Sequence, residues 1–304
     1  MTIKEQLLTI QRETQLSQEK MAQELGVSFP TLNSWIKGRS EPRFLAQKKI
    51  RELYARVTGE AVVSPKEKAL KLQQLEARSK AHPHVLKIIL KRPDLADEFM
   101  LHLTYHSNRI EGNTLTMDET ASVLFNVHPL ADKTFVEQLE VKNHQVALNF
   151  VWKHLKDLPL NENWVLKIHG MLMNGIREDA GWYRNHAVRI VGSYVPTANP
   201  LKVPELMRKL APAFEAHPKD FFRHLAIVHA SFEKIHPFSD GNGRGGRLLL
   251  NAMLLSADFA PALIREEKRR LYYTYLKKAQ LDEEYGPLED FLMDAVLEGY
   301  GLLE

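Results

Sequence analysis

The junction between a glycine-rich turn and an apolar stretch constrains the fold more than any other part of this chain. Residues 236–247 read HPFSDGNGRGGR, and the next eight residues, LLLNAMLL, have the composition of a buried helix. A helix that begins at such a turn has free backbone N–H groups at its positive end, and these bind anions. The fold must therefore bury this helix while its N-terminus stays open to a ligand.

The side chains of the same segment fit nucleotide phosphates and a metal ion. Arg244 and Arg247 carry forked donors suited to phosphate oxygens, and Asp240 is a carboxylate for a divalent cation that binds with the phosphates. His236 lies just ahead of the turn, where it can accept a proton. The residues predicted to bind nucleotide in this segment are Asp240, Gly241, Asn242, Gly243, Arg244, Gly245, Gly246 and Arg247.

The segment resembles the Fic family pattern H-P-F-x-D/E-G-N-G-R-x-x-R and matches it at all nine specified positions. The resemblance implies a nucleotidyltransferase that moves AMP from ATP to a Ser, Thr or Tyr hydroxyl of a target protein. It assigns His236 as the general base and Asp240 as the Mg²⁺ ligand. Relatives that transfer phosphate or phosphocholine depart from the D-G-N-G core that Asp240 to Gly243 keep, whereas UTP or GTP in place of ATP stays open.

A second short segment, SNRIEGN at 107–113, resembles the inhibitory pattern S/T-x-x-x-E-G/N of the same family through Ser107, Glu111 and Gly112. The resemblance implies that Glu111 pairs with Arg247, the arginine that would otherwise hold the γ-phosphate. A desolvated carboxylate–guanidinium pair is a strong restraint, because removal of one partner strands the other. Some relatives use this glutamate to reverse the modification, which the sequence leaves open.

Residues 187–196 have β-branched alternation and Gly and Pro punctuation, which predicts a short hairpin. The resemblance identifies it as a flap that binds the target segment along its edge and lies over the nucleotide. The further nucleotide-binding candidates are Arg189, Ile190, Val191 and Gly192 on the flap, and Tyr272, Tyr273 and Gln280 near the base. For the three residues near the base, ordinary helix packing is the alternative.

The first 58 residues resemble a Cro/phage-repressor-type helix-turn-helix. Ser17 and Ser28 are predicted N-caps of the second and third helices, and Gly26 ends the second. The whole formal charge of +3 lies in the first sixty residues, where ten basic side chains face seven acidic ones. A helical bundle kept for dimerisation or docking is the alternative to DNA binding. The predicted DNA-contacting residues are Phe29, Thr31, Asn33, Ser34 and Lys37.

The remainder predicts a mainly all-α protein, a helical bundle of the Fic type with the hairpin flap, behind the helix-turn-helix. Apolar residues recur at helical spacing in 95–106, 120–126, 135–155, 163–174, 204–215, 220–234 and 246–255. We expect a helix-turn-helix at 1–58, a linker and connecting helix at 59–80, and a Fic domain at 81–304. The Fic domain would contain the inhibitory helix at about 100–113 and the motif at 236–247.

Composition and patterning also restrict the environment. The chain has no cysteine, which excludes disulfides and thiolate chemistry. Its start lacks the apolar core of a signal peptide, and its most apolar stretch is interrupted by polar residues, so we expect a cytoplasmic protein without a membrane span. An alternative function is a DNA-binding regulator, or a toxin-like enzyme that controls its own transcription, whose Fic domain binds nucleotide. The oligomeric state stays open.

Overall fold

The computed structural model describes residues 2–60, 62, 65–126, 130–190 and 194–304. Its first four helices form a small bundle: α1 (Ile3–Thr14), α2 (Gln18–Leu25), α3 (Phe29–Ile36) and α4 (Phe44–Thr58). The hydroxyls of Ser17 and Ser28 accept the backbone N–H of Lys20 and Thr31, and Gly26 ends α2 in the left-handed region. Both expected caps are therefore present, and the bundle closes over a core of its own around Leu32.

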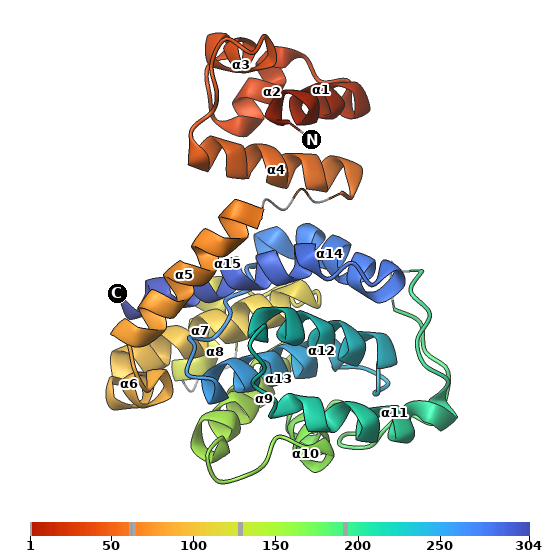
Figure 1. Ribbon diagram of the computed structural model, residues 1–304. Coiled ribbons are helices and arrows are strands. Elements are labelled where there is room, and N and C mark those ends of the chain that lie inside the picture. Colours follow the sequence, from red (N-terminus) through yellow and green to blue (C-terminus); the bar gives the residue numbers. More distant parts are fainter. Residues whose placement is uncertain (1, 61, 63–64, 127–129, 191–193) are drawn as a thin grey trace.

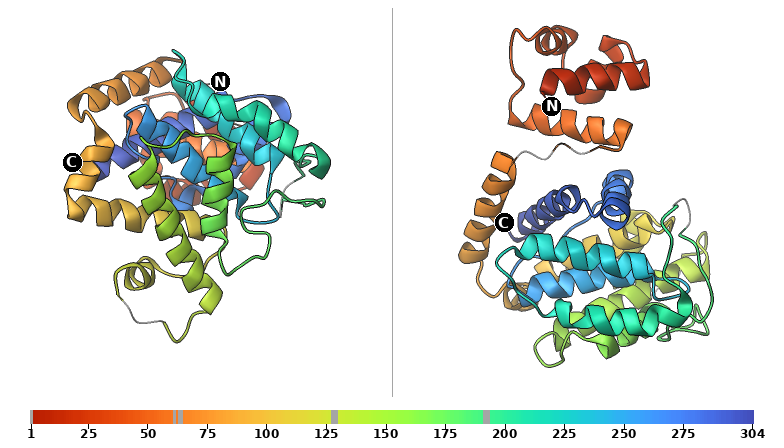
Figure 2. Two further views of the ribbon diagram at one scale, coloured as in Figure 1. Left: turned by 90° about the horizontal axis from the view of Figure 1, so that it is seen from below. Right: turned by 45° about the vertical axis from the view of Figure 1, so that its right-hand side comes forward.

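The rest of the described chain folds into a larger helical body with a second, continuous core (Figures 1 and 2). Three short 3₁₀ turns join some of its helices. The helices are α5 (Pro65–Ala81), α6 (Val85–Lys91), α7 (Pro93–Ile110), α8 (Met117–Phe125), α9 (Phe135–His154), α10 (Glu162–Leu172), α11 (Val203–Leu210), α12 (Phe221–Ile235), α13 (Asn242–Ser256), α14 (Arg269–Asp282) and α15 (Gly286–Leu303).

Helix α13 lies at the centre of this body and positions the functional loop. It packs against α7, α9, α10 and α12, and its side chains from Arg244 to Leu255 are buried. From Leu248 to Leu255 the helix is apolar on nearly every side, apart from Asn251, and such a segment is stable only inside a core. Its N-cap is Gly241 at φ 76°, which offers no side chain to cap the first N–H groups. The buried helix therefore holds the loop before α13 in place, while no N-cap side chain occupies the N–H groups of the helix N-terminus.

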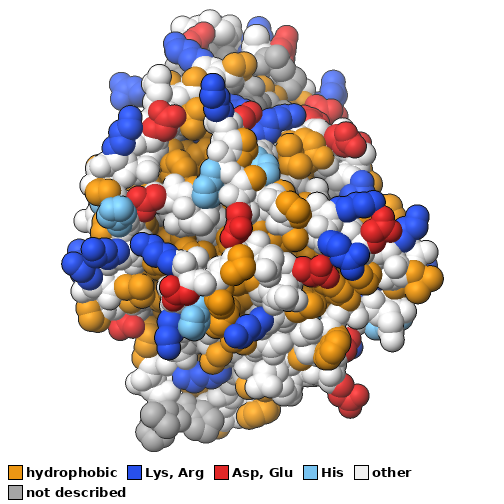
Figure 3. All heavy atoms as spheres, turned by 60° about the horizontal axis from the view of Figure 1, so that its bottom comes forward, with side chains coloured by type: hydrophobic (Ala, Val, Ile, Leu, Met, Phe, Trp, Pro, Cys, Tyr) orange, Lys and Arg blue, Asp and Glu red, His pale blue; other side chains and the backbone are white. Residues whose placement is uncertain are grey.

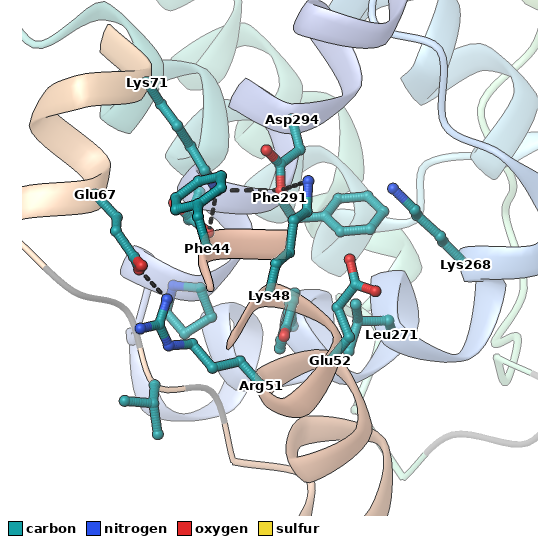
Figure 4. A pocket seen from close by; sticks show the side chains of 14 residues that line it. Phe44, Lys48, Arg51, Glu52, Glu67, Lys71, Lys268, Leu271, Phe291 and Asp294 are labelled. Atoms are coloured by element: carbon teal, nitrogen blue, oxygen red, sulfur yellow. Dashed lines mark hydrogen bonds and ion pairs between the residues drawn. The ribbon is translucent and has the colours of Figure 1, made fainter. Parts of the chain in front are cut away.

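The small bundle rests on the larger body through α4, which packs against α14 (Figure 2). A pocket at this junction is walled by Phe44 of α4 and Phe291 of α15 (Figure 4). Lys48 pairs with Asp294 at 3.1 Å, and Lys71 of α5 pairs with the same carboxylate at 3.1 Å. Apolar contact and ion pairs thus connect the two parts.

The expected hairpin is not formed in the residues that the structure describes. Residues 184–190 and 194–199 are two extended arms without strand pairing, and Figure 1 shows them in green along the side of the body. The Thr197 hydroxyl donates to the Val188 carbonyl at 2.8 Å and so joins the two arms. Backbone carbonyls that a ladder would use are instead bonded to side chains, including Arg184. Val191 and Gly192 lie outside the described residues.

The surface away from the small bundle carries interleaved Lys, Arg, Asp and Glu side chains with apolar side chains between them (Figure 3). This face does not concentrate charge of one sign. Among the described residues, no helix has both the length and the apolar character that a bilayer crossing needs.

Candidate functional site

The loop between α12 and α13 is held in place by its own side chains. Asn242 accepts the Phe238 N–H at 2.8 Å and donates to the Phe238 carbonyl at 2.9 Å, so its amide closes the turn. His236 ends α12 with φ 51° and ψ 64°, a left-handed conformation that costs free energy for a non-glycine residue. The predicted nucleotide residue Asn242 therefore contributes its side chain to loop shape, and its backbone N–H to the helix end.

His169 of α10 supports the same loop, a role that no motif in the sequence predicts. Its ring stacks on Phe238 with centroids 3.6 Å apart and planes 4° apart. Its Nδ1 accepts the Gly181 N–H at 2.9 Å, so its Nε2 carries the proton that is donated to the Asp240 carbonyl at 3.0 Å. Burial lowers the pKa of His169 to about 4, which keeps the ring neutral in this role.

Arg247 and Glu111 meet at the open end of α13. The guanidinium is 5% exposed and donates from Nη2 to Glu111 Oε1 at 2.7 Å. It also donates from Nε to the Ser107 hydroxyl at 3.0 Å and from Nη2 to the Ser107 carbonyl at 2.9 Å. Gly112, at φ 104°, turns the chain directly after the glutamate. Glu111 and Ser107, two of the predicted inhibitory residues, thus contact Arg247 from 136 and 140 residues away.

Glu111 also covers the first turn of α13. A Cβ placed on Gly243 would clash with Glu111 Oε1 and would lie 2.9 Å from its carboxyl carbon and 3.0 Å from Arg247 Nη1. That Nη1 is buried and has no hydrogen-bond partner among the described residues. An unpaired buried donor beside an uncapped helix N-terminus is an anion site by its chemistry. The Glu111 carboxylate occupies part of that site.

Arg244 does not share this position. Its side chain is 2% exposed and donates to Glu140 Oε1 of α9 at 2.7 Å, while Asp240 Oδ1 is 3.6 Å away. The second oxygen of Glu140 accepts the Asn113 amide at 2.9 Å, which ties this pair to the turn after Glu111. Arg244, predicted to bind phosphate, thus bonds a carboxylate of α9, and its predicted phosphate contact has no support from this placement.

His236 has the environment of a neutral proton acceptor. Its Nδ1 lies 3.3 Å from the Glu233 carbonyl, an arrangement that suits a proton on Nδ1 and leaves Nε2 as the acceptor. Burial lowers the pKa of His236 below its usual value, against the opposing effect of the Glu233 carbonyl. The imidazole is therefore in its basic form at neutral pH, which a general base requires.

Asp240 fits a cation that arrives with a ligand and does not fit a preformed metal centre. Its Oδ1 accepts the Gly241 N–H at 2.6 Å, and its side chain is 55% exposed. No group of three or more His, Cys, Asp or Glu residues converges on a metal position among the described residues. One carboxylate plus ligand oxygens and waters is an ordinary Mg²⁺ environment.

Gly245 and Gly246 lie within α13 and face other helices. A Cβ on Gly246 would clash with Glu233 Oε1 and would lie 3.1 Å from the Phe232 ring, and one on Gly245 would approach Leu172 at 3.9 Å. Gly246 therefore allows α12 to pack closely, whereas the space beside Gly245 would accept a Cβ at ordinary contact distance. Their predicted contact with a nucleotide has no support from this placement.

The candidates for base contact separate into buried and accessible residues. Tyr272 is fully buried, with its hydroxyl 2.6 Å from His229 Nε2, and Gln280 is also buried. Tyr273 is partly exposed, and its pKa is raised to about 12 by burial and by the nearby Glu111 carboxylate. Both tyrosines interact electrostatically with Arg247 and Glu111, but of the two only Tyr273 is partly exposed. On the described part of the flap, Arg189 is exposed and Ile190 is half-buried.

The DNA candidates lie on α3, at the end of the molecule far from α14 (Figure 1). Phe29, Thr31 and Lys37 are exposed, whereas Asn33 and Ser34 are half-buried. The hydroxyls of Thr31 and Ser34 already bond to Ser28 at 2.8 Å and to Ser40 at 2.7 Å. The α3 surface is thus unobstructed by the larger body, although two of its hydroxyls have local partners.

Comparison with known proteins identifies both parts of the chain. Residues 159–254 match the Fic/DOC family and residues 11–56 match a helix-turn-helix family. The chain is 33% identical over 211 residues to "Protein adenylyltransferase Fic" of Nematostella vectensis, covering 65% of this chain and 46% of that protein. The protein of the same name from Culex quinquefasciatus is 30% identical over 224 residues, covering 69% and 42%. The chain therefore spans less than half the length of these relatives.

Solved structures show the same fold. A Fic domain containing signaling protein from Bacteroides thetaiotaomicron superposes with a TM-score of 0.66 at 22% identity, covering 76% of this chain and 95% of that one. A Fic family protein from Desulfovibrio desulfuricans gives 0.66 at 25% identity, covering 79% and 74%. This chain thus contains a Fic/DOC domain and an N-terminal helix-turn-helix domain.

Proposed function

We propose that this chain, with its Fic/DOC domain behind a helix-turn-helix, transfers AMP from ATP to a hydroxyl side chain of a target protein. The observation that carries the proposal is the anion site at the start of α13. There the unpaired Arg247 Nη1 lies beside an uncapped helix N-terminus, one loop away from His236. The adenylyltransferase names of the relatives, at 30–33% identity, support the choice of AMP as the transferred group.

In the proposed reaction, the hydroxyl oxygen of a Ser, Thr or Tyr bonds to the α-phosphorus of ATP. The bond from that phosphorus to the bridging oxygen breaks, and pyrophosphate leaves. The hydroxyl proton passes to Nε2 of His236, which we expect to accelerate transfer by about 10²–10⁴-fold. The first N–H groups of α13 and the Arg247 guanidinium would stabilise the phosphate charge. Mg²⁺ held by Asp240 would neutralise phosphate charge when it is bound.

Glu111 is the proposed brake on this reaction. Its carboxylate bonds to Arg247 Nη2 and covers Gly243, so a phosphate that approaches Nη1 and the first turn of α13 must first displace it. Two negative groups cannot share one guanidinium edge without strong repulsion. The wild-type protein would therefore be nearly silent, and loss of the carboxylate would activate it. The same carboxylate is also the candidate for positioning a water that removes AMP from a modified target.

The test compares the wild type with Glu111→Gly and His236→Ala, each incubated with α-labelled ATP and Mg²⁺. We expect labelling of the protein itself or of lysate proteins by Glu111→Gly only, and loss of that label in the double variant. Glu178→Gly, at an exposed loop glutamate of the same domain, is the matched control and should stay silent. Absence of label from Glu111→Gly refutes transferase activity. Labelled UTP and GTP, tested in parallel, identify the nucleotide. Removal of label from a modified protein by the wild type but not by Glu111→Gly identifies the reverse reaction.

A second proposed activity is DNA binding through α3, supported by its exposed face far from α14. Lys37 is placed to contact phosphate, which releases counterions and makes affinity depend on salt. The test measures binding to the DNA upstream of the protein's own gene at several salt concentrations. For Lys37→Ala, we expect the magnitude of the slope of log K against log salt to fall by about 1. An unchanged slope and affinity would favour the alternative, a bundle for docking. Activity together with DNA binding would describe an enzyme that controls its own transcription.

A further inference from the structure

Arg184 is a buried cation without a carboxylate partner in the described part of the chain. It is 2% exposed, and no ion pair of Arg184 occurs there. Burial lowers its pKa, with no opposing carboxylate. A buried guanidinium is costly unless all its donors are satisfied, so what it bonds to explains why it is there.

All of its partners are backbone carbonyls, and they come from two different segments. Nε donates to the His236 carbonyl at 2.7 Å, and Nη2 reaches the Ile235 carbonyl at 3.3 Å. Nη1 donates to the His186 carbonyl at 2.7 Å, and Nη2 to the Ala198 carbonyl at 2.6 Å. These last two carbonyls belong to the two arms of the flap segment. One planar side chain therefore bonds the loop of the general base and both arms.

The conformation of His236 needs such support. Its backbone is left-handed, and Pro237 follows it, which adds steric restriction. Such conformations cost about 1–3 kcal/mol and persist only where the surroundings over-determine them. Arg184 supplies that restraint twice, because its own N–H also donates to the Pro237 carbonyl at 3.0 Å.

We infer that Arg184 is a positioning residue that fixes the flap arms and the His236 backbone in one register, so that the target hydroxyl and the base meet. This inference rests on the proposed transfer reaction. Lysine could not replace the arginine, because its donors radiate from one nitrogen whereas the guanidinium fork reaches carbonyls in several directions. Arg184 touches neither Arg247 nor the start of α13, so nucleotide affinity should not depend on it.

The activity test places Arg184→Lys in the Glu111→Gly background, with Arg208→Lys at an exposed site of α11 as the matched control. Self-labelling is measured at saturating ATP and Mg²⁺, and ATP affinity by calorimetry. Because a displacement of about 1 Å at a reacting group can cost about 10²-fold, we expect labelling to slow by about 10–100-fold. ATP affinity should stay within about 3-fold of the control. Labelling equal to that of the control, or a parallel loss of ATP affinity, overturns the inference.

Backbone hydrogen exchange provides a readout that does not depend on activity. In Arg184→Lys, we expect the hydrogen-bonded amides of Arg184, His236 and Phe238 to exchange faster together, while α1–α4 keep their protection. Unchanged exchange at His236 and Phe238 overturns the inference. If Arg184→Lys loses protection everywhere, Thr197→Val decides, since it removes a bond between the arms and leaves Arg184 in place. Amides of His236 and Phe238 that stay protected in Thr197→Val then support Arg184 as the link, and faster exchange there refutes it. If Glu111→Gly does not label any protein but Arg184→Lys still raises exchange at Arg184 and His236 together, the transfer reaction is rejected and the positioning role of Arg184 is retained.

Discussion

Replacing Glu111 by alanine should lower the stability of the free protein and raise its response to nucleotide. Alanine avoids the extra backbone freedom of glycine at a residue with φ −84°. Breaking a fully buried ion pair costs about 3–5 kcal/mol, because the remaining charge is stranded. Here the Glu111 side chain is 30% exposed, and Arg247 keeps two bonds to Ser107. A loss of about 2 kcal/mol is therefore expected, close to the value of a hydrogen bond to a charged group.

Nucleotide should recover that loss in the variant and have little effect on the wild type. A ligand at 100 times its Kd stabilises the folded state by about 2.7 kcal/mol. In the variant, ATP meets a free Arg247, whereas in the wild type it must displace a carboxylate 2.7 Å from the guanidinium. Urea unfolding of both proteins, with and without ATP and Mg²⁺, measures the four free energies. Equal stability of the two free proteins, or equal stabilisation by ATP, would refute the competition between Glu111 and phosphate.

Three further outcomes are expected. Since burial lowers the pKa of His236, labelling by Glu111→Gly should be constant above pH 7 and should fall only below pH 6.5 in a rate–pH profile; a fall between pH 8 and 7 would contradict this. Burial raises the pKa of Glu233 from 4.5 to about 8, so its contribution to stability is present below about pH 4.5 and is lost as the pH rises to about 8. Glu233→Gln should remove that decline in urea unfolding at pH 5 and pH 8, and an unchanged slope would exclude Glu233 as its source. A Cβ on Gly299 clashes with the Pro261 carbonyl, whereas one on Gly301 meets nothing within 4 Å. Gly299→Ala should cost about 1–3 kcal/mol in thermal unfolding and Gly301→Ala should stabilise by about 0.5–1 kcal/mol; similar effects would contradict the packing.

Features that depend only on residues close together in the sequence could be predicted from it. Ser17, Gly26 and Ser28 act within one helical turn, and they begin and end α2 and α3 as expected. The apolar run after Gly246 likewise lies inside α13. The contact between Glu111 and Arg247 was expected from the resemblance, because spacing alone does not bring residues 136 positions apart together.

Partners that meet only in the folded core could not be predicted. Glu140 bonds Arg244 across 104 residues, and no periodic pattern marks a carboxylate as the partner of a particular arginine. Tyr272 was expected near a base, but its hydroxyl bonds His229 inside the core. The alternation around Val188 predicted strands, but alternation reports side-chain preference and not which backbone carbonyls the Arg184 side chain will bind.

The packing of α5 on α15 has a consequence for the order in which this protein is made. Lys71 bonds Asp290 at 2.7 Å across 219 residues, and Leu75 on the same helix is fully buried. At about 5–20 residues per second, a ribosome needs about 10–40 s to synthesise the intervening chain. The small N-terminal bundle can close early because its core is local, while α5 stays without this partner until α15 has been made. Docking of the connecting helix must therefore wait for α15, and a chain that stops before α15 leaves Leu75 without that cover.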